Sequence, residues 1–123
     1  MQIILDTHVF LWAIADPDRL NEQRRYELES PGNTVYVSAV SISEIIIKAS
    51  MGKLSADFDP LAVAIDSGFE PLDYTAQDAL CLKDLPYHHR DPFDRMLIAQ
   101  SINTGHPLMS DDRKFTLYDC RLL

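Results

Sequence analysis

Four acidic residues of this chain stand where a strand-like segment ends or a helix-like segment begins. They are Asp6, Glu44, Asp94 and Asp112. Carboxylates held close together raise the cost of ionising one another, so a cluster of four needs a partner that offsets the repulsion. A divalent metal ion with oxygen ligands is the usual partner. Such an ion supplies an activated water and stabilises a leaving oxygen, as phosphodiester hydrolysis requires. The four acids therefore predict metal-dependent phosphodiester chemistry.

Taken one at a time, these acids are explained better by helix capping. Ser41-x-x-Glu44 has the pattern of a capping box. Asp91-Pro92-x-Asp94 has an N-cap, a proline at the first helical position and an acid in the first turn. Asp6 is similarly placed to cap the helix that follows it. Only the joint position of the four acids in the fold separates a metal site from four separate caps.

The elements that position these acids alternate along the chain between strands and helices. A short apolar run at residues 3–5 is typical of a buried parallel strand, and the β-branched run at 34–38 of a second. Further strands are predicted at 69–72 and 107–109, with a fifth at 120–123. Helices are predicted at 7–15, 21–29, 41–52, 59–68, 75–82 and 91–103. This order predicts one domain over residues 1–123, a three-layer α/β/α sandwich with a parallel sheet of four to five strands.

In such a sandwich, strand carboxyl ends and helix amino ends share one edge, where sites form. Asp6 ends the first strand, Asp112 follows the fourth, and Glu44 and Asp94 lie in first helical turns. Glu44 also lies nearly opposite the apolar face predicted for its helix. The pattern of that helix therefore does not place Glu44 in the core. That face consists of Ile42, Ile45, Ile46 and Ala49. We therefore expect the four carboxylates to meet at this edge.

Composition and charge narrow the choice of partners. The net charge of −8 excludes a general nucleic-acid binder with a basic face, although a metal-dependent enzyme on nucleic acid remains compatible with it. No apolar run is long enough to span a bilayer, and the first strand leaves no room for a signal peptide. Two isolated cysteines, Cys81 and Cys120, predict reduced thiols and hence a cytoplasmic protein.

Four segments of the chain resemble the PIN-domain ribonucleases, in particular the VapC-type toxins of bacterial toxin–antitoxin pairs. The segments are ILDTHVFLW (4–12), SAVSISEIIIKASMGKL (38–54), HRDPFDRMLIAQ (89–100) and PLMSDDRKF (107–115). Their order and spacing match the family over nearly the whole chain. The resemblance implies a PIN-like fold and hydrolysis of RNA with one or two Mg²⁺ or Mn²⁺ ions. It also implies a homodimer and a separate protein antitoxin that covers the acidic pocket.

The family's acidic quartet maps onto Asp6, Glu44, Asp94 and Asp112 of this sequence. Asp94 is preferred to Asp91 because it opens the pattern D-x-x-[LI]-x-A, and Asp112 to Asp111 because it precedes Phe115 by three residues. We expect Asp6 and Asp94 to bind the metal directly, and Glu44 and Asp112 to do so directly or through water. The hydroxyls and the second-choice acids are expected to orient water or phosphate: Thr7, Ser110, Asp91 and Asp111. Arg95, Arg113 and Lys114 are candidates for holding the RNA backbone.

Other readings compete with this one. His88-His89 is interpreted as a loop pair rather than a transition-metal site, because no cysteine or histidine lies at ligand spacing nearby. A phosphoacceptor receiver domain would need a paired acid after the first strand and a lysine beyond Lys114, and the chain has neither. A PIN-like module that only binds RNA or protein would not need all four acids. An enzyme of the same fold acting on DNA flaps would need a helical arch that this chain is too short to hold. Apolar residues around Val9–Ala15 and at Ile47 further predict a protein–protein contact.

Overall fold

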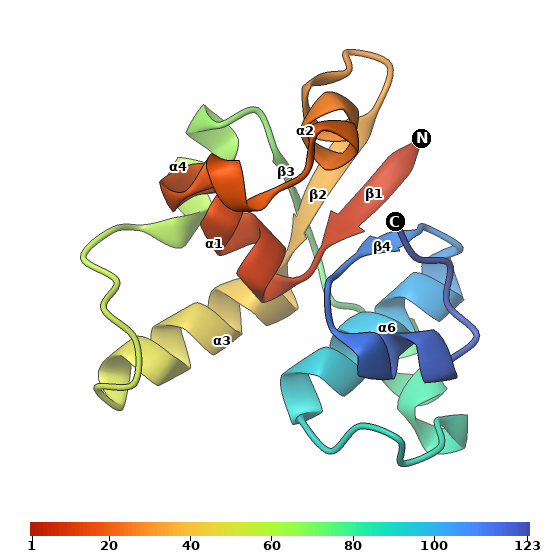
Figure 1. The fold of residues 1–123 in the computed structure, drawn as a ribbon. Coiled ribbons are helices and arrows are strands. Elements are labelled where there is room, and N and C mark those ends of the chain that lie inside the picture. Colours follow the sequence, from red (N-terminus) through yellow and green to blue (C-terminus); the bar gives the residue numbers. More distant parts are fainter.

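A four-stranded parallel sheet forms the centre of the computed structural model, which describes all 123 residues. The strands lie in the order β3-β2-β1-β4, with bounds Glu70–Leu72, Thr34–Ser38, Gln2–Leu5 and Leu108–Met109. In Figure 1 the arrows of β1 and β2 point the same way, as their parallel pairing from Gln2↔Thr34 to Leu5↔Val37 requires. Because β1 is central and covered on both faces, all three residues of its apolar run are fully buried. The predicted parallel α/β sandwich is confirmed.

Helices cover the two faces of this sheet. The α-helices are α1 (Thr7–Ala15), α2 (Glu22–Glu29), α3 (Ala39–Ser50), α4 (Pro60–Asp66), α5 (Ala76–Leu80) and α6 (Pro92–Thr104). Three short 3₁₀ helices accompany them: η1 (Pro17–Arg19), η2 (Cys81–Asp84) and η3 (Arg113–Leu117). None of the helices is long and apolar enough to cross a membrane.

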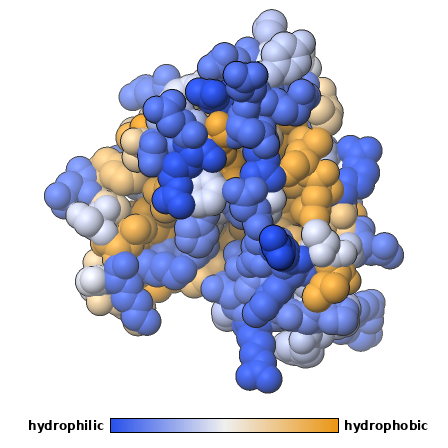
Figure 2. Space-filling view, in the orientation of Figure 1, coloured by the Kyte–Doolittle hydropathy of each residue, from blue (hydrophilic) through white to orange (hydrophobic).

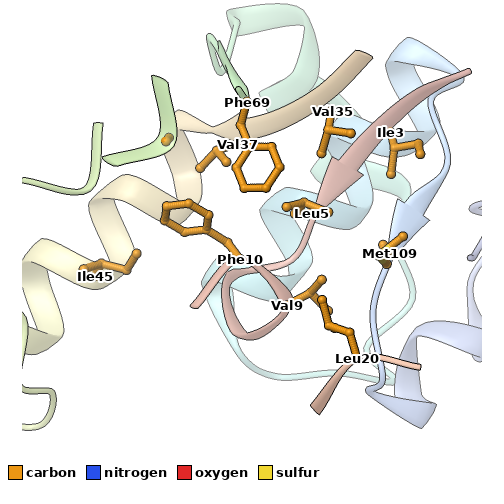
Figure 3. Packing of buried hydrophobic residues seen from close by; sticks show 11 residues of the cluster. Ile3, Leu5, Val9, Phe10, Leu20, Val35, Val37, Ile45, Phe69 and Met109 are labelled. Carbon is orange, nitrogen blue, oxygen red and sulfur yellow. The ribbon is translucent and has the colours of Figure 1, made fainter. Parts of the chain in front are cut away.

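Two hydrophobic clusters fill the spaces between the sheet and its covering helices. In the first, Leu5 and Met109 on the sheet lie with Val9 of α1, and Phe10 meets Phe69 edge to face at 6.1 Å between ring centroids (Figure 3). In the second, on the other face, side chains of β1 and β4 pack against α6 and η3; its fully buried members include Ile4, Leu97, Ile98, Leu108 and Phe115. Because both faces of the sheet are covered, polar groups can converge only at its edges.

The third helix differs from its prediction in two respects. It begins at Ala39 with Ser38 as its N-cap, so the capping box predicted at Ser41 does not form. Its buried face includes Ser41 and Glu44, whereas Ile46 is 50% exposed. The predicted face is partly right, because Ile45 is buried and Ile42 packs against the core. The buried face turns towards Ser41 and Glu44 because both contact Thr7 at the start of α1. Ile47, predicted to lie away from the core, is exposed.

The C-terminal residues form less regular structure than predicted. The fifth strand expected at residues 120–123 is reduced to one parallel bridge between Leu108 and Leu122. The Leu108 amide donates to the Arg121 carbonyl at 2.8 Å, and the Leu123 amide donates to the Leu108 carbonyl at 3.0 Å. Because β4 has only two residues, it offers this segment a single pairing position.

Hydrophilic side chains dominate the surface in the view of Figure 2, with hydrophobic side chains exposed in separate areas between them. The large exposed apolar residues on α3 and α4 are Ile46, Ile47, Leu61 and Ile65. Residues of α3, α4 and β3 also line a groove of about 420 Å³. This side of the molecule therefore offers an apolar surface that the chain itself leaves uncovered.

Candidate functional site

The first two acids follow neighbouring strands. Asp6 directly follows β1 and caps α1, its Oδ1 accepting the Val9 amide at 2.7 Å. The Asp6 amide donates to the Met109 carbonyl at 3.0 Å, which ties the ends of β1 and β4 together. Asp112 lies three residues beyond β4 and caps η3, its Oδ1 accepting the Lys114 amide at 2.9 Å. Burial raises the pKa of Asp6 above its usual range. Both caps therefore place their carboxylates at the carboxyl edge of the sheet.

Asp94 comes to the same edge from the first turn of α6. Asp91 is the N-cap of this helix, and its Oδ1 accepts the Asp94 amide at 3.1 Å. Burial, and after it the negative charges of Asp91, Glu44 and Asp6, raise the pKa of Asp94 to about 7, with His89 partly offsetting them. The structure thus brings acids from β1, α3 and α6 close enough to interact strongly, as the parallel topology predicts.

Glu44 is only 3% exposed and reaches the site from α3. Its Oε1 accepts the Thr7 hydroxyl at 2.7 Å, and Thr7 Oγ1 also lies 2.9 Å from Ser41 Oγ. Its second oxygen pairs with the Lys48 ammonium one turn along the helix. The hydrogen bond with Glu44 raises the pKa of Lys48, with burial opposing it. Lys48 was missed in the sequence, although its i, i+4 spacing from Glu44 is a detectable signal.

His89 also lies at this site, a position that its interpretation as one of a loop pair did not predict. His88 is exposed, whereas His89 is 7% exposed. Its Nε2 lies 2.8 Å from Asp94 Oδ2 and 2.8 Å from Asp112 Oδ2. Burial raises the pKa of Asp112, but hydrogen bonds from the Lys114 amide and His89 outweigh it and leave the pKa below its ordinary value. The imidazole therefore connects the acids of α6 and η3.

A comparison of the sequence with protein-family models identifies the family of this chain. The family model of the PIN domain matches residues 3–119. The chain belongs to the PIN domain family. This membership excludes the phosphoacceptor receiver domain. A search of curated proteins found no match.

Solved structures share the fold of this PIN domain over its whole length. VapBC2 from Rickettsia felis, bound to a DNA fragment from its promoter, has a TM-score of 0.75 at 16% identity, covering 100% of this chain and 98% of that chain. DNA-bound VapBC from Salmonella typhimurium has a TM-score of 0.70 at 23% identity, covering 100% and 97%. VapBC-5 of Mycobacterium tuberculosis, a member of the VapBC family of toxin-antitoxin systems, has a TM-score of 0.59 at 18% identity, covering 99% and 95%. At these identities the likeness concerns the fold.

The three basic residues predicted to hold the RNA backbone differ in their exposure to solvent. Arg113 and Lys114 are exposed directly after Asp112. Arg95 is buried, and its guanidinium donates to the carbonyls of Pro86 at 2.9 Å and His89 at 3.3 Å. Arg95 is therefore committed to holding the loop before α6 and is not available to an RNA phosphate. Arg95 is buried because the loop before α6 folds around it, and the spacing of residues in the sequence does not indicate this.

Ser110 and Asp111, which were predicted to orient water or phosphate, also form contacts within the protein. Ser110 Oγ accepts the Asp112 amide at 3.0 Å. Asp111 is exposed and forms an ion pair with Arg24 of α2. The Arg24 guanidinium also donates to the Ser110 and Leu123 carbonyls, both at 2.9 Å. Arg24 thus fixes the turn after β4 from which Asp112 projects.

The donor atoms at this edge suit a hard divalent ion. Donor atoms of His89, Asp94 and Asp112 lie within 4.8 Å of one another. Asp6 and Glu44 lie outside this group, but near enough for their charges to raise the pKa of Asp94. Oxygen-rich sites favour Mg²⁺ and Mn²⁺. Burial and then the neighbouring carboxylates disfavour the ionised form of Asp94, and such an ion would stabilise that form. The largest cavity, about 600 Å³, lies elsewhere, between η2, α6 and η3.

Proposed function

We propose that this PIN domain is a metal-dependent endoribonuclease that hydrolyses RNA phosphodiester bonds. The observation that carries the proposal is the convergence of Asp6, Glu44 and Asp94 at one sheet edge, where burial and then the neighbouring negative charges raise the pKa of Asp94 to about 7. Repulsion among these carboxylates destabilises a protein that binds no cation. Helix capping alone does not require the repulsion, because acids placed far apart would cap the helices equally well. Membership of the PIN domain family agrees with a nuclease.

In this proposal Asp6 and Asp94 bind one or two Mg²⁺ or Mn²⁺ ions directly, and Glu44 and Asp112 bind them directly or through water. The bound metal supplies an acidified water and stabilises charge on the leaving oxygen. Thr7 orients the Glu44 carboxylate through its 2.7 Å hydrogen bond. The protein's share of the chemistry is to keep these oxygens converged before substrate arrives.

The exposed cations beside the acids hold the RNA in place. Arg113 and Lys114 are positioned to contact phosphates that flank the scissile bond, because they follow Asp112 directly. With a net charge of −8, the rest of the protein repels RNA, so these contacts and the metal must provide the attraction. Ser110 and Asp111 support this segment rather than the substrate.

Cleavage of total RNA by partner-free protein tests the activity. With Mg²⁺ or Mn²⁺ we expect discrete fragments, and with EDTA none. Asp94→Asn should abolish cleavage, whereas Asp66→Asn, a matched change of an exposed acid on α4, should leave it intact. Cleavage by Asp94→Asn at the wild-type rate would refute the assignment. Metal binding without cleavage of any RNA would favour a PIN-like module that only binds RNA or protein.

We further propose that the protein is the toxin of a toxin–antitoxin pair and forms a homodimer. The support is the fold shared with VapBC complexes and the uncovered apolar side chains of α3 and α4, which include Ile46 and Ile47. The antitoxin would be a separate protein that covers the acidic edge. Light scattering at micromolar concentration should give twice the chain mass, and a monomer would contradict the dimer. Co-expression with the antitoxin should restore growth that the toxin alone arrests.

A further inference from the structure

The position of His89 is fixed by contacts that do not involve the acids. Its backbone amide donates to the Tyr118 hydroxyl at 2.8 Å, and its carbonyl accepts from the Arg95 guanidinium. Its ring packs against that of Phe115, with 5.8 Å between centroids. Because these contacts come from α6 and from the C-terminal segment, the imidazole is held at the acidic edge whether or not an ion is bound.

One ring nitrogen of His89 is already used as an acceptor. The Asp91 amide donates to Nδ1 at 3.2 Å, which requires a lone pair and no proton on Nδ1. In the neutral ring the proton then lies on Nε2. Nε2 in turn lies 2.8 Å from one oxygen of Asp94 and one of Asp112. Nε2 is therefore the donor in the hydrogen bond with Asp112, lies in contact with Asp94, and has no lone pair for a metal.

We infer that His89 is a positioning residue, which donates its Nε2 proton to Asp112, contacts Asp94 and does not bind the metal itself. This inference rests on the proposed function. Hydrogen-bonded partners of metal-binding carboxylates typically fix ligand orientation and strengthen metal binding. Here one imidazole contacts two ligands from distant segments, the start of α6 and the turn after β4. The metal shell then consists of oxygens, and the imidazole stands behind it.

Direct coordination by His89 is the competing arrangement, because its nitrogen lies within 4.8 Å of the oxygens of Asp94 and Asp112. It would require the ring to move its proton to Nδ1, opposite the Asp91 amide, and so to lose that hydrogen bond. It would also shift metal preference from Mg²⁺ towards ions that favour imidazole, such as Zn²⁺ and Ni²⁺. The two arrangements thus predict different behaviour of the same residue.

Two amide substitutions separate them. The amide nitrogen of Gln lies near the position of Nε2 and can donate to the carboxylates, whereas Asn is too short to reach them. Neither amide nitrogen binds a metal. We expect His89→Gln to retain the wild-type affinity for Mn²⁺ and His89→Asn to weaken it roughly 10- to 100-fold. Binding is measured by titration with electron paramagnetic resonance of free Mn²⁺, and thermal melting in EDTA verifies that each variant is folded.

Equal loss of Mn²⁺ affinity in both variants would overturn the inference in favour of a direct ligand. Unchanged affinity in both would overturn it in favour of a packing role. Long-range ¹H–¹⁵N correlation spectra of wild-type His89 give a second reading, which does not depend on folding of the variants. The Nε2 proton should persist when Mg²⁺ is added, and its transfer to Nδ1 would also overturn the inference. A wild-type protein that binds no Mn²⁺ would instead refute the proposed function.

Discussion

Removing the charge of Asp94 should stabilise the metal-free protein, and the gain should depend on pH. Asp94 has an ordinary pKa of 3.8 when exposed and a pKa of about 7 in the folded protein. The unfolded chain therefore releases this proton at lower pH than the folded chain. Stability that is fully present below about pH 4 is lost progressively as the pH rises through about 7. The effect is a penalty on the folded state that Asp94→Asn removes.

The difference of about three pKa units sets the size of this penalty. Each unit corresponds to about 1.4 kcal/mol, so ionising Asp94 costs the folded state at most about 4 kcal/mol above pH 7. Solvent screening at this partly exposed carboxylate reduces this figure, and we expect a gain of about 2 kcal/mol for Asp94→Asn at pH 8. At pH 4, where Asp94 is neutral in the folded protein, the variant and the wild type should be almost equally stable.

Urea denaturation in EDTA at pH 4.5, 6 and 8 measures this difference directly. Asp66→Asn, which changes an exposed carboxylate, should show no such trend. Saturating Mg²⁺ should reverse the order at pH 8, because ligand binding stabilises only the protein that retains its metal site. A pH-independent difference, or a destabilised variant at pH 8, would refute the claim that repulsion among the acids strains the metal-free fold.

Two further predictions concern the cations. Arg95→Met should cost about 2–4 kcal/mol in urea denaturation, because the buried carbonyls of Leu85 and His89 lose their Arg95 donor. Arg121→Met, at an exposed position, is the control, and equal stability of both variants would contradict the role given to Arg95. Arg113→Ala combined with Lys114→Ala should raise the KM for RNA and leave kcat nearly unchanged, because the two cations bind the substrate equally well in the ground state and in the transition state. A large fall in kcat at unchanged KM would contradict this role of the two cations.

The parts of the fold that could be predicted are those governed by local pattern. The buried run of β1 and the helix caps at Asp6 and Asp91 follow from residue type and spacing. The same patterns place Asp6 and Asp94 at one sheet edge, because parallel topology leaves them no other. The roles of these acids at a metal remain predictions.

Features that depend on distant contacts could not be predicted. His89 enters the site because Tyr118, 29 residues later, accepts its amide. Arg95 reads in the sequence as a surface cation beside an acid, yet the folding of the preceding loop around it buries its guanidinium. The buried face of α3 was partly misassigned because Glu44 is satisfied by Thr7, a partner on another helix. In each case the decisive partner lies outside the local pattern.

The strand order determines when the acidic edge of the sheet can form during synthesis of the chain. β1 is made well before β4, yet they are neighbours in the sheet, and Ile4 pairs with Leu108. Contacts between segments so far apart in sequence form late in folding. While the ribosome is still making residues 92–112, Asp6 and Glu44 lack Asp94 and Asp112 as neighbours. If the four acids form the proposed nuclease site, that site is incomplete during this stage of synthesis, and its activity begins only after β4 has joined the sheet.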